Sequence, residues 1–383
     1  MNREEILSRS DALHERVQRF ALANDGDSFD AIACDIARFQ ADAIPGYRRL
    51  ADARGSLLDD ASALPAVPTD AFRLTRVAVH DSADDVTRFV SSGTTAEARS
   101  VHALRRTDTL ERLALSWGRK ALVPHWPARR VVIALAPHPG APATSSLGFM
   151  MRSFIASLDG RALAADPAGA AFDPDSSARW LASPQGLDAE GVRRAALVAL
   201  ERQEPLLVLA TSFALVALLD GLGGERLRAP KNSVVMQTGG FKGRTRTVSP
   251  GALSSAIARA FGIDEARIVG EYGMTELSSQ AYEGTLADAE LSGPPSVYLP
   301  PPWLRIHSVD PVRLIRLPPG EVGLARFVDL ANVDSAVCIV TKDLVREVDG
   351  GVELIGRSPG APLRGCSLTL EQLLPGKAAG GAA

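Results

Sequence analysis

Short apolar runs and amphipathic helical segments alternate along the middle of the chain. The runs VVIAL, LLVLA, VVM and RIV are rich in aliphatic and β-branched residues, and turn-forming residues flank them. Continuous apolar runs of this length are typical of strands that are buried on both faces of a parallel sheet. The segments 190–200, 212–222 and 249–262, which lie between the runs, have helical periodicity. The alternation therefore predicts α/β layers with a mostly parallel sheet.

The two ends of the chain show different patterns. Residues 3–60 have the periodicity of amphipathic helices, with Cys34 on an apolar face, where a buried structural thiol is expected. From about residue 296 the chain becomes Pro-rich and strand-like, without a long helix, which predicts a small antiparallel sheet or barrel. We expect a helical N-terminal segment over 1–65 and a β-rich subdomain over 296–345.

Charge and cysteine content limit the classes of partner. The chain has 42 basic and 45 acidic residues, a net charge of −3, which predicts neither general nucleic-acid binding nor attraction to an anionic membrane. The N-terminus is charged and helix-periodic, unlike a signal peptide, and no apolar run approaches the roughly 20 residues of a membrane span. Because the three cysteines are scattered, we expect a reducing compartment and a cytoplasmic protein.

The segment SSGTTAEARS, residues 91–100, is small and rich in hydroxyl groups. Gly93 lets the backbone turn, and the hydroxyls around it can donate beside exposed backbone N–H groups. Arg99 adds a fixed positive charge. This chemistry suits a loop around the phosphates of a nucleotide, and a Ser/Thr-rich surface turn is the alternative.

The segment EYGMTE, residues 271–276, leaves the last of the predicted parallel strands. Ligands of open α/β sheets bind at the carboxyl ends of such strands. Glu276 can hold a magnesium ion that faces a triphosphate, and Tyr272 can stack on a base. A solvated acidic turn is the alternative interpretation of this segment.

Five motifs occur in an order that resembles the adenylate-forming superfamily, which contains acyl-CoA synthetases, luciferase and peptide-synthetase adenylation domains. SSGTTAEARS is followed by QTGGFKGR, EYGMTE, TKDL and the GR of 356–357. The doubled serine, GGFK and an RGC triplet make the chain most similar to the acyl-protein synthetases of the bacterial luminescence fatty-acid reductase complex. The resemblance spans about residues 88–366. It implies the superfamily's large domain: layered α/β subdomains with mostly parallel sheets plus a small β-barrel-like subdomain.

The resemblance also implies a role for each matched position. The phosphate loop would contain Ser91, Ser92, Gly93, Thr94, Thr95 and Arg99. The adenine and nucleotide contacts would come from Gly239, Gly240, Tyr272, Gly273 and Met274. Thr275 would meet the α-phosphate and Glu276 would bind Mg²⁺, and both are predicted to be catalytic. Asp343 would hold the ribose hydroxyls, and Arg357 at the hinge would also reach the ribose. Ala96 and Arg99 stand where the superfamily usually has Gly and Lys; an arginine keeps the charge.

The chain departs from the superfamily pattern after the hinge. A typical member continues into a mobile C-terminal domain whose lysine orients the carboxylate, whereas 26 residues follow Arg357 here. We therefore expect an N-terminal domain over 1–355, a short arm over 356–383, and no such lid; Lys377 in the tail is not assigned the lysine's role.

Cys366 is the candidate acyl acceptor of that arm. It follows Arg364 and precedes helix-forming sequence, which predicts a lowered thiol pKa and a better nucleophile. In the luminescence synthetases a cysteine near the C-terminus carries the acyl group as a thioester. An ordinary buried residue is the alternative for Cys366, and Cys338, inside the apolar AVCIV, is expected in the core.

Four further groups near the motifs have two interpretations each. Lys242 and Lys342 are either solvated side chains or contacts to substrate or phosphate. His102 and His138 are either polar loop residues or contacts to the acyl group or its carboxylate. The other histidines have no spacing that suggests a metal site.

Together these expectations describe a two-step ligase that uses ATP and Mg²⁺. A carboxylic acid, a fatty acid in the luminescence branch, would become an acyl-adenylate and then pass to a thiol. That thiol would belong to Cys366, an acyl-CoA-reductase-like partner, an acyl carrier protein or coenzyme A. The alternatives are an acid–CoA or aryl-acid adenylating ligase of secondary metabolism, with a structural Cys366, and a non-catalytic nucleotide-binding relic.

Overall fold

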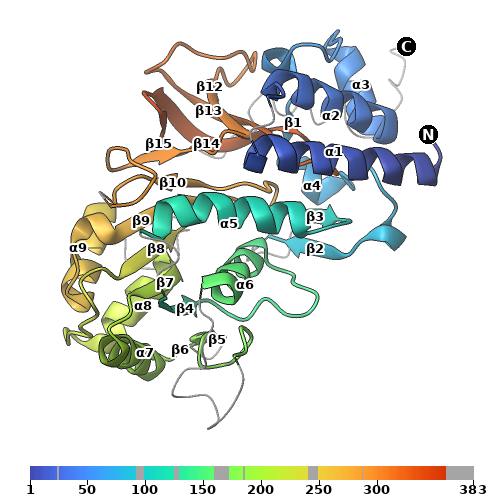
Figure 1. Ribbon diagram of the computed structural model, residues 1–383. Coiled ribbons are helices and arrows are strands. Elements are labelled where there is room, and N and C mark those ends of the chain that lie inside the picture. Colours follow the sequence, from blue (N-terminus) through green and yellow to red (C-terminus); the bar gives the residue numbers. More distant parts are fainter. Residues whose placement is uncertain are drawn as a thin grey trace, which may run out of the picture. The chain divides into compact units, whose positions relative to one another are not determined.

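The computed structural model describes residues 1–23, 26–91, 99–124, 129–158, 172–183, 186–239, 249–286 and 288–358. They group into two compact units (Figure 1). The first unit holds residues 1–114, 274–279 and the chain from 300 onward; the second holds 115–273 and 280–299. The chain passes from the second unit to the first between Gly273 and Met274, inside the EYGMTE segment.

A parallel sheet forms the centre of the second unit. Its strands are β4 (Val131–Leu135), β7 (Leu206–Thr211), β8 (Val234–Thr238) and β9 (Ile268–Tyr272), paired in that order and all parallel. Two short strands, β10 (Ala281–Glu283) and β11 (Val297–Leu299), continue the sheet antiparallel from β9. The four predicted parallel strands are thus confirmed, and every residue of β4 is buried, as its continuous apolar run predicts.

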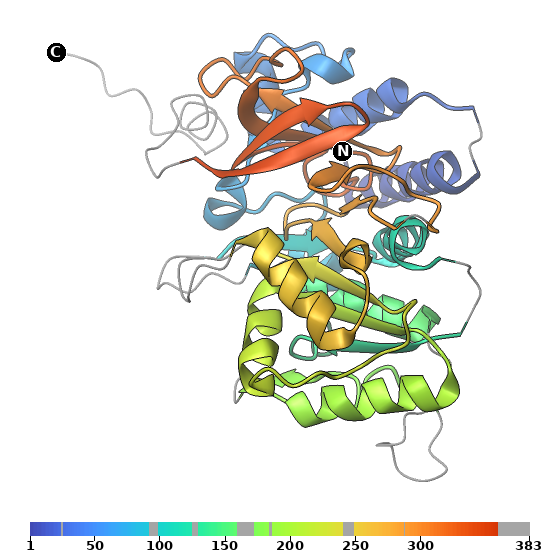
Figure 2. The same ribbon diagram turned by 90° about the vertical axis from the view of Figure 1, so that its left-hand side faces the viewer.

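Helices cover both faces of this sheet. On one face, α7 (Ala189–Arg202), α8 (Ser212–Leu222) and α9 (Pro250–Phe261) share an apolar core with the strands, and Figure 2 views the unit from this side. On the other face, α6 (Ser146–Leu158) packs on β4. Residues 131, 133 and 135 of β4 belong to the core shared with α7, α8 and α9. Because successive side chains of a strand alternate between its two faces, those of residues 132 and 134 point to the α6 face. A two-stranded ribbon, β5 (Ala182–Ser183) with β6 (Gly186–Leu187), precedes α7.

The ends of these helices have the capping chemistry that their sequences predict. Thr211 and Ser249 accept backbone N–H groups at the starts of α8 and α9. Gly223 and Gly262 end the same helices in left-handed conformation. Because β7 and β8 are parallel, the loops that follow them lie at the same carboxyl edge of the sheet, where ligands of such sheets bind.

The helix α5 (Asp108–Leu122) carries a glycine in its interior for a packing reason. A Cβ on Gly118 would lie 2.1 Å from the ring of Phe154 on α6, a distance that no real contact allows. The helix therefore needs a residue without a side chain at the point where the aromatic ring crosses it. The helical propensity lost at that glycine, about 1 kcal/mol, is offset by the packing of the ring.

The N-terminal part of the first unit is helical, as predicted. It comprises α1 (Arg3–Ala23), α2 (Phe29–Ala43) and α3 (Pro45–Ala53), followed by the short α4 (Ala71–Leu74). Ser28 caps α2, and Pro45 begins α3 at a position where its missing N–H costs nothing. Cys34 is buried on α2, in agreement with the expected structural thiol.

The remainder of the first unit is β-rich. Strands β12 (Leu304–Val309), β13 (Val322–Asp329), β14 (Cys338–Val348) and β15 (Gly351–Arg357) pair antiparallel in that order. The short β1 (Val67–Pro68) pairs parallel with β14, and β2 (Thr87–Val90) forms a separate antiparallel pair with β3 (Val101–Leu104). The predicted antiparallel sheet is confirmed, and Cys338 lies fully buried within it. Among the described residues, 3₁₀ turns occur in this unit at η1 (Ala61–Ala63) and η2 (Ser82–Asp84), and in the second unit at η3 (Glu265–Arg267).

Two sequence expectations concern the chain as a whole. In the part of the chain that the structure describes, no helix is long and apolar enough to cross a membrane. The division into a domain over 1–355 and an arm over 356–383 stays a prediction.

Candidate functional site

Buried polar side chains of the first unit hold the turn at Thr275 and Glu276 through its backbone. Asn332 donates from Nδ2 to the carbonyl oxygen of Glu276 (2.9 Å) and also to that of Ala336 (3.0 Å). Within the segment, the N–H of Leu277 donates to the carbonyl oxygen of Met274 (3.2 Å). Glu276 is buried, whereas Thr275 is half-buried. The predicted catalytic pair thus lies on a turn with a fixed backbone.

Asp329 anchors the residues just after this turn. Its carboxylate accepts the backbone N–H of Ser278 (3.0 Å) and the hydroxyl of Ser279 (2.7 Å). It also accepts the N–H of Ala331 (3.0 Å), which fixes the carboxylate itself. Burial raises the pKa of Asp329 to about 6 because the charged form loses water, although these hydrogen bonds lower it. The anchor is therefore a fully buried group at the end of β13.

His102, on β3, contacts the same turn. Its Nδ1 lies 2.9 Å from the carbonyl oxygen of Thr275, and its Nε2 lies 2.9 Å from the hydroxyl of Ser335. The edge of Phe72 packs against the ring at 5.8 Å between centroids. The imidazole is completely buried, and burial lowers its pKa to about 4, so it is neutral at physiological pH. The interpretation of His102 as a loop residue is wrong, because β3 pairs with β2 throughout its length.

A second buried cluster joins α1 to the loop that carries Ser335. The carboxylate of Asp334 accepts the hydroxyl of Ser10 and lies 3.0 Å from Nε2 of His14. The other ring nitrogen of His14 lies 2.9 Å from the hydroxyl of Thr109. Burial opposes ionisation of Asp334, yet these hydrogen bonds and the nearby positive charge hold its pKa at about 2. Two turns of α1 are thereby fixed to the residue next to Ser335.

The predicted phosphate loop is closed at its base by two hydrogen bonds. The N–H of Ser91 donates to the carbonyl oxygen of Ser100 (3.0 Å), and the N–H of Ser100 donates to the hydroxyl of Ser91 (3.1 Å). Arg99, beside this base, is exposed. The loop residues between them, Ser92, Gly93, Thr94, Thr95 and Ala96, lie outside the described residues.

In the second unit, Tyr272 and Gly273 sit at the end of β9 beside a buried carboxyl group. The ring of Tyr272 is buried and lies 5.8 Å from that of Tyr298. Glu271 is fully buried and accepts a hydrogen bond from the hydroxyl of Thr238. A Cβ on Gly273 would lie 2.6 Å from Oε1 of Glu271, so a larger residue here would displace this carboxyl group. Burial raises the pKa of Glu271 to about 7.

Gly239 follows β8 at the same edge of the sheet. Its φ of +76° lies in the left-handed region that favours glycine. The hydroxyl of Ser212, at the start of α8, donates to its carbonyl oxygen (2.6 Å). Gly240 and Lys242 lie outside the described residues.

The two predicted ribose contacts pair with one another in the first unit. Asp343 on β14 faces Arg357 on β15 across the ladder, and Nε of Arg357 donates to the carboxylate (2.9 Å). The arginine side chain is 67% exposed. Next to them, Lys342 forms an ion pair with Asp70 (2.7 Å).

The candidates His138 and Cys366 differ in outcome, because only His138 lies among the described residues. His138 lies 2.8 Å from the carboxylate of Asp175, which also takes two hydrogen bonds from Arg152, so it belongs to an ion-pair network in the second unit. Cys366 and Lys377 lie outside the described residues, and the acceptor role of Cys366 stays a prediction.

The oxygen ligands around the turn fit a magnesium ion that accompanies ATP. Glu276 offers a carboxylate and Thr275 a hydroxyl, which are hard donors of the kind that Mg²⁺ prefers. Among the described residues there is no group of three or more His, Cys, Asp or Glu side chains that could hold a metal. In nucleotide sites Mg²⁺ commonly takes its other ligands from phosphate oxygens and water.

The buried anchors of the turn were not found from the sequence. Each of Asn332, Asp334 and Ser335 has a partner more than fifty positions away along the chain. Their one sequence signal is a run of polar residues, in DLANVDS, between two apolar segments that form buried strands. A polar run in such a place must find hydrogen-bond partners, and here Asn332 reaches the Thr275–Glu276 turn directly and Ser335 reaches it through His102.

Comparison of the sequence with known proteins gives a match to a short segment of the chain. No family model matches the chain. A segment of 88 residues is 34% identical to the long-chain-fatty-acid–luciferin-component ligase of Vibrio harveyi; it covers 21% of this chain and only 23% of that protein.

Solved structures of 2-hydroxyisobutyryl-CoA ligase match most of the chain. In the postadenylation state with R3-HIB-AMP, that ligase matches 92% of this chain and 72% of its own, at a TM-score of 0.60 and 15% identity. An open conformation with 2-HIB-AMP and CoA matches 87% of this chain and 75% of its own, at 0.58 and 15% identity. The chain therefore shares the fold of this ligase over most of its length, in agreement with the predicted fold class.

Proposed function

We propose that this protein activates a carboxylic acid with ATP as an acyl-adenylate and then transfers the acyl group to a thiol. The observation that carries the proposal is the Thr275–Glu276 turn, whose backbone is held by buried groups and whose side chains are those expected at the α-phosphate and at Mg²⁺. The adenylate-forming fold and the closed base of the SSGTT loop support it.

In the first step, a carboxylate oxygen of the acid attacks the α-phosphorus of ATP. The bond from that phosphorus to the bridging oxygen breaks, and pyrophosphate leaves. Thr275 donates its hydroxyl to an α-phosphate oxygen, and Arg99 contributes positive charge at the phosphates. Glu276 would hold the magnesium ion, which would offset the negative charge that gathers on the phosphates. Because the turn is fixed before ATP binds, little reorganisation accompanies charge development.

In the second step, a thiolate attacks the acyl carbon and AMP leaves. The partial similarity to the Vibrio harveyi ligase favours a fatty acid and a protein thiol, with Cys366 as the acceptor or as a relay to a reductase-like partner. The match to a ligase solved with CoA favours coenzyme A as a second candidate acceptor. Both acceptors use the same adenylate.

Incubation with ATP, Mg²⁺ and a panel of fatty, aryl and short hydroxy acids tests the first step. We expect acid-dependent release of AMP when hydroxylamine traps the activated acyl group, with one class of acid strongly preferred. Calorimetric binding of ATP with no acid-dependent release for any class would contradict the proposal and favour a nucleotide-binding protein.

Substitution of cysteines tests the acceptor. Cys366→Ser should still form the adenylate but no hydroxylamine-labile acyl-protein, whereas Cys34→Ser, at a buried thiol, should retain both. Persistent acyl-protein in Cys366→Ser would exclude Cys366. Acyl-CoA formed by both variants would identify coenzyme A as the acceptor.

A further inference from the structure

The hydrogen bond between His102 and the Thr275–Glu276 turn fixes the tautomer of the His102 ring. A carbonyl oxygen only accepts hydrogen bonds, so the Nδ1 that faces Thr275 carries the proton. In a neutral ring Nε2 is then a bare acceptor, and the hydroxyl of Ser335 donates to it. The ring is fully buried.

The Ser335 hydroxyl, which donates to His102, is itself positioned by the contacts of α1 with the neighbouring residue Asp334. Asp334, the preceding residue, is held by Ser10 and His14, and its carbonyl oxygen accepts the N–H of Val79 (2.9 Å). Ser10 also accepts a hydrogen bond from Arg105 (2.8 Å), so the contact is fixed from two sides.

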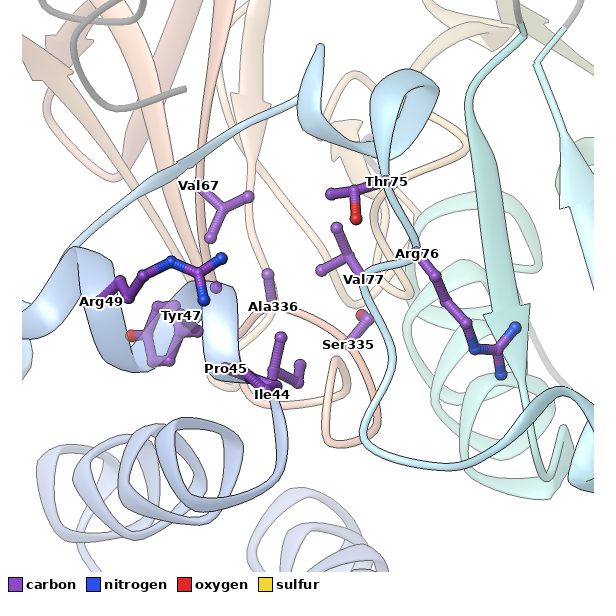
Figure 3. A pocket seen from close by; sticks show the side chains of 11 residues that line it. Ile44, Pro45, Tyr47, Arg49, Val67, Thr75, Arg76, Val77, Ser335 and Ala336 are labelled. Atoms are coloured by element: carbon purple, nitrogen blue, oxygen red, sulfur yellow. The ribbon is translucent and has the colours of Figure 1, made fainter. Parts of the chain in front are cut away.

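Ser335 also lies at the wall of a cavity of about 240 Å³ (Figure 3). Apolar residues (Ile44, Val77) and polar ones (Tyr47, Thr75) line the same cavity. The partner of the Ser335 hydroxyl is the buried Nε2 of His102.

From this arrangement we propose that His102 is a positioning residue for the adenylation step: its Nδ1–H holds the Thr275 carbonyl, and α1 orients the ring through Asp334 and Ser335. The inference rests on the proposed function, because Thr275 is the residue expected at the α-phosphate. His102 itself touches neither ATP nor the acid. Its effect is to set the direction in which the Thr275 side chain leaves the backbone, since a rotated peptide would misplace the hydroxyl.

A pair of amide variants, each of which replaces one nitrogen of the ring, separates positioning from structural support. In His102→Asn the side-chain N–H₂ can occupy the place of Nδ1–H and donate to Thr275. In His102→Gln the amide reaches the place of Nε2 and meets Ser335 instead. Both variants lose the ring and leave a similar space. We expect His102→Asn to keep ATP–pyrophosphate exchange within about threefold of wild type and His102→Gln to lose about tenfold in kcat, at matched thermal stability. Equal rates for the two variants would overturn the proposal.

The tautomer provides a readout that does not depend on activity. ¹⁵N NMR of the histidine-labelled full chain, with the His102→Asn variant as the assignment control, should show a protonated Nδ1 and an unprotonated Nε2 for this residue. An Nε2–H tautomer would overturn the proposal even if the enzyme is active. If wild type shows no exchange with any acid, the proposed function fails, whereas the tautomer still tests the positioning.

The contribution of α1 has a matched control on the same helix. Ser10→Ala removes a hydroxyl bonded to Asp334, whereas Ser8→Ala removes an exposed one. We expect Ser10→Ala to lower kcat for exchange about threefold and Ser8→Ala to leave it unchanged. A Ser10→Ala variant that is less stable but exchanges at the wild-type rate would show that α1 supports the fold alone and would overturn its part in the proposal.

Discussion

The Thr275–Glu276 turn and the Asp343–Arg357 pair both carry residues predicted to contact ATP, but they are held in different ways. The turn is bound by His102 and Asn332, and the residues just after it by Asp329, all of them buried. The side chains of the strand pair form an ion pair whose arginine is mostly exposed. Buried hydrogen bonds fix geometry before a ligand arrives, whereas an exposed ion pair contributes little to stability. Under the proposed function, the phosphate end of the site would be preorganised and the ribose end would be ordered by the nucleotide.

The largest expected effect comes from removing the anchor behind the turn. Asp329→Ala leaves the buried N–H of Ser278 and the hydroxyl of Ser279 without their acceptor. We expect unfolding in denaturant to show a loss of about 3 kcal/mol in the free energy of unfolding. Exchange activity should fall with it. A loss below about 1 kcal/mol would contradict a preorganised turn.

The buried carboxyl of Glu271 should make the stability of the second unit depend on pH. Its pKa is about 7 in the folded chain, above the ordinary value of 4.5. The folded state therefore binds a proton that the unfolded state has lost, and this contribution is present below pH 4.5 and is lost as the pH rises through 7. The shift corresponds to about 3 kcal/mol.

Glu271→Gln keeps an acceptor for Thr238 and removes the titration. We expect the free energy of unfolding of wild type, relative to this variant, to fall between pH 5 and 8. Parallel pH profiles of the two proteins would contradict a protonated Glu271.

The pKa shift of His102 should make stability depend on pH in the opposite direction. Its pKa is lowered from 6.5 to about 4 by burial, partly offset by its hydrogen bond to Thr275 and by Asp334. The unfolded state therefore binds a proton that the folded state refuses, and stability is lost as the pH falls from 6.5 through 4, by up to about 3 kcal/mol. His102→Asn should remove this loss. Unfolding measured between pH 4 and 7 would contradict the account if both proteins lose stability equally.

The smallest effect is expected at the exposed pair. Arg357→Gln removes an ion pair that is open to solvent, so the free energy of unfolding should change by less than about 1 kcal/mol. The KM for ATP should rise severalfold with kcat little changed, because the side chain contributes to binding alone. A large fall in kcat would show that the ribose end is as preorganised as the turn.

Local sequence patterns predicted the elements well, and long-range polar contacts poorly. The apolar runs of β4 and β7 and the periodicity of α2 specify strand or helix within a few residues, because burial on two faces or one imposes a period. The partners of His102 lie 173 and 233 positions away, and nothing local in VHAL indicates them. The interpretation of His102 as a loop residue failed for the same reason. The strand β3 forms by pairing with β2, which lies on the other side of the predicted phosphate loop in the sequence.

The central claim is that the Thr275–Glu276 turn is the phosphate end of an adenylating site, and acid-dependent ATP–pyrophosphate exchange tests it most directly. Wild type, Glu276→Gln and Arg357→Gln would be compared at saturating ATP and Mg²⁺ with the preferred acid. We expect exchange to fall at least about a hundredfold in Glu276→Gln and to remain within about threefold of wild type in Arg357→Gln. Undiminished exchange in Glu276→Gln would contradict the account.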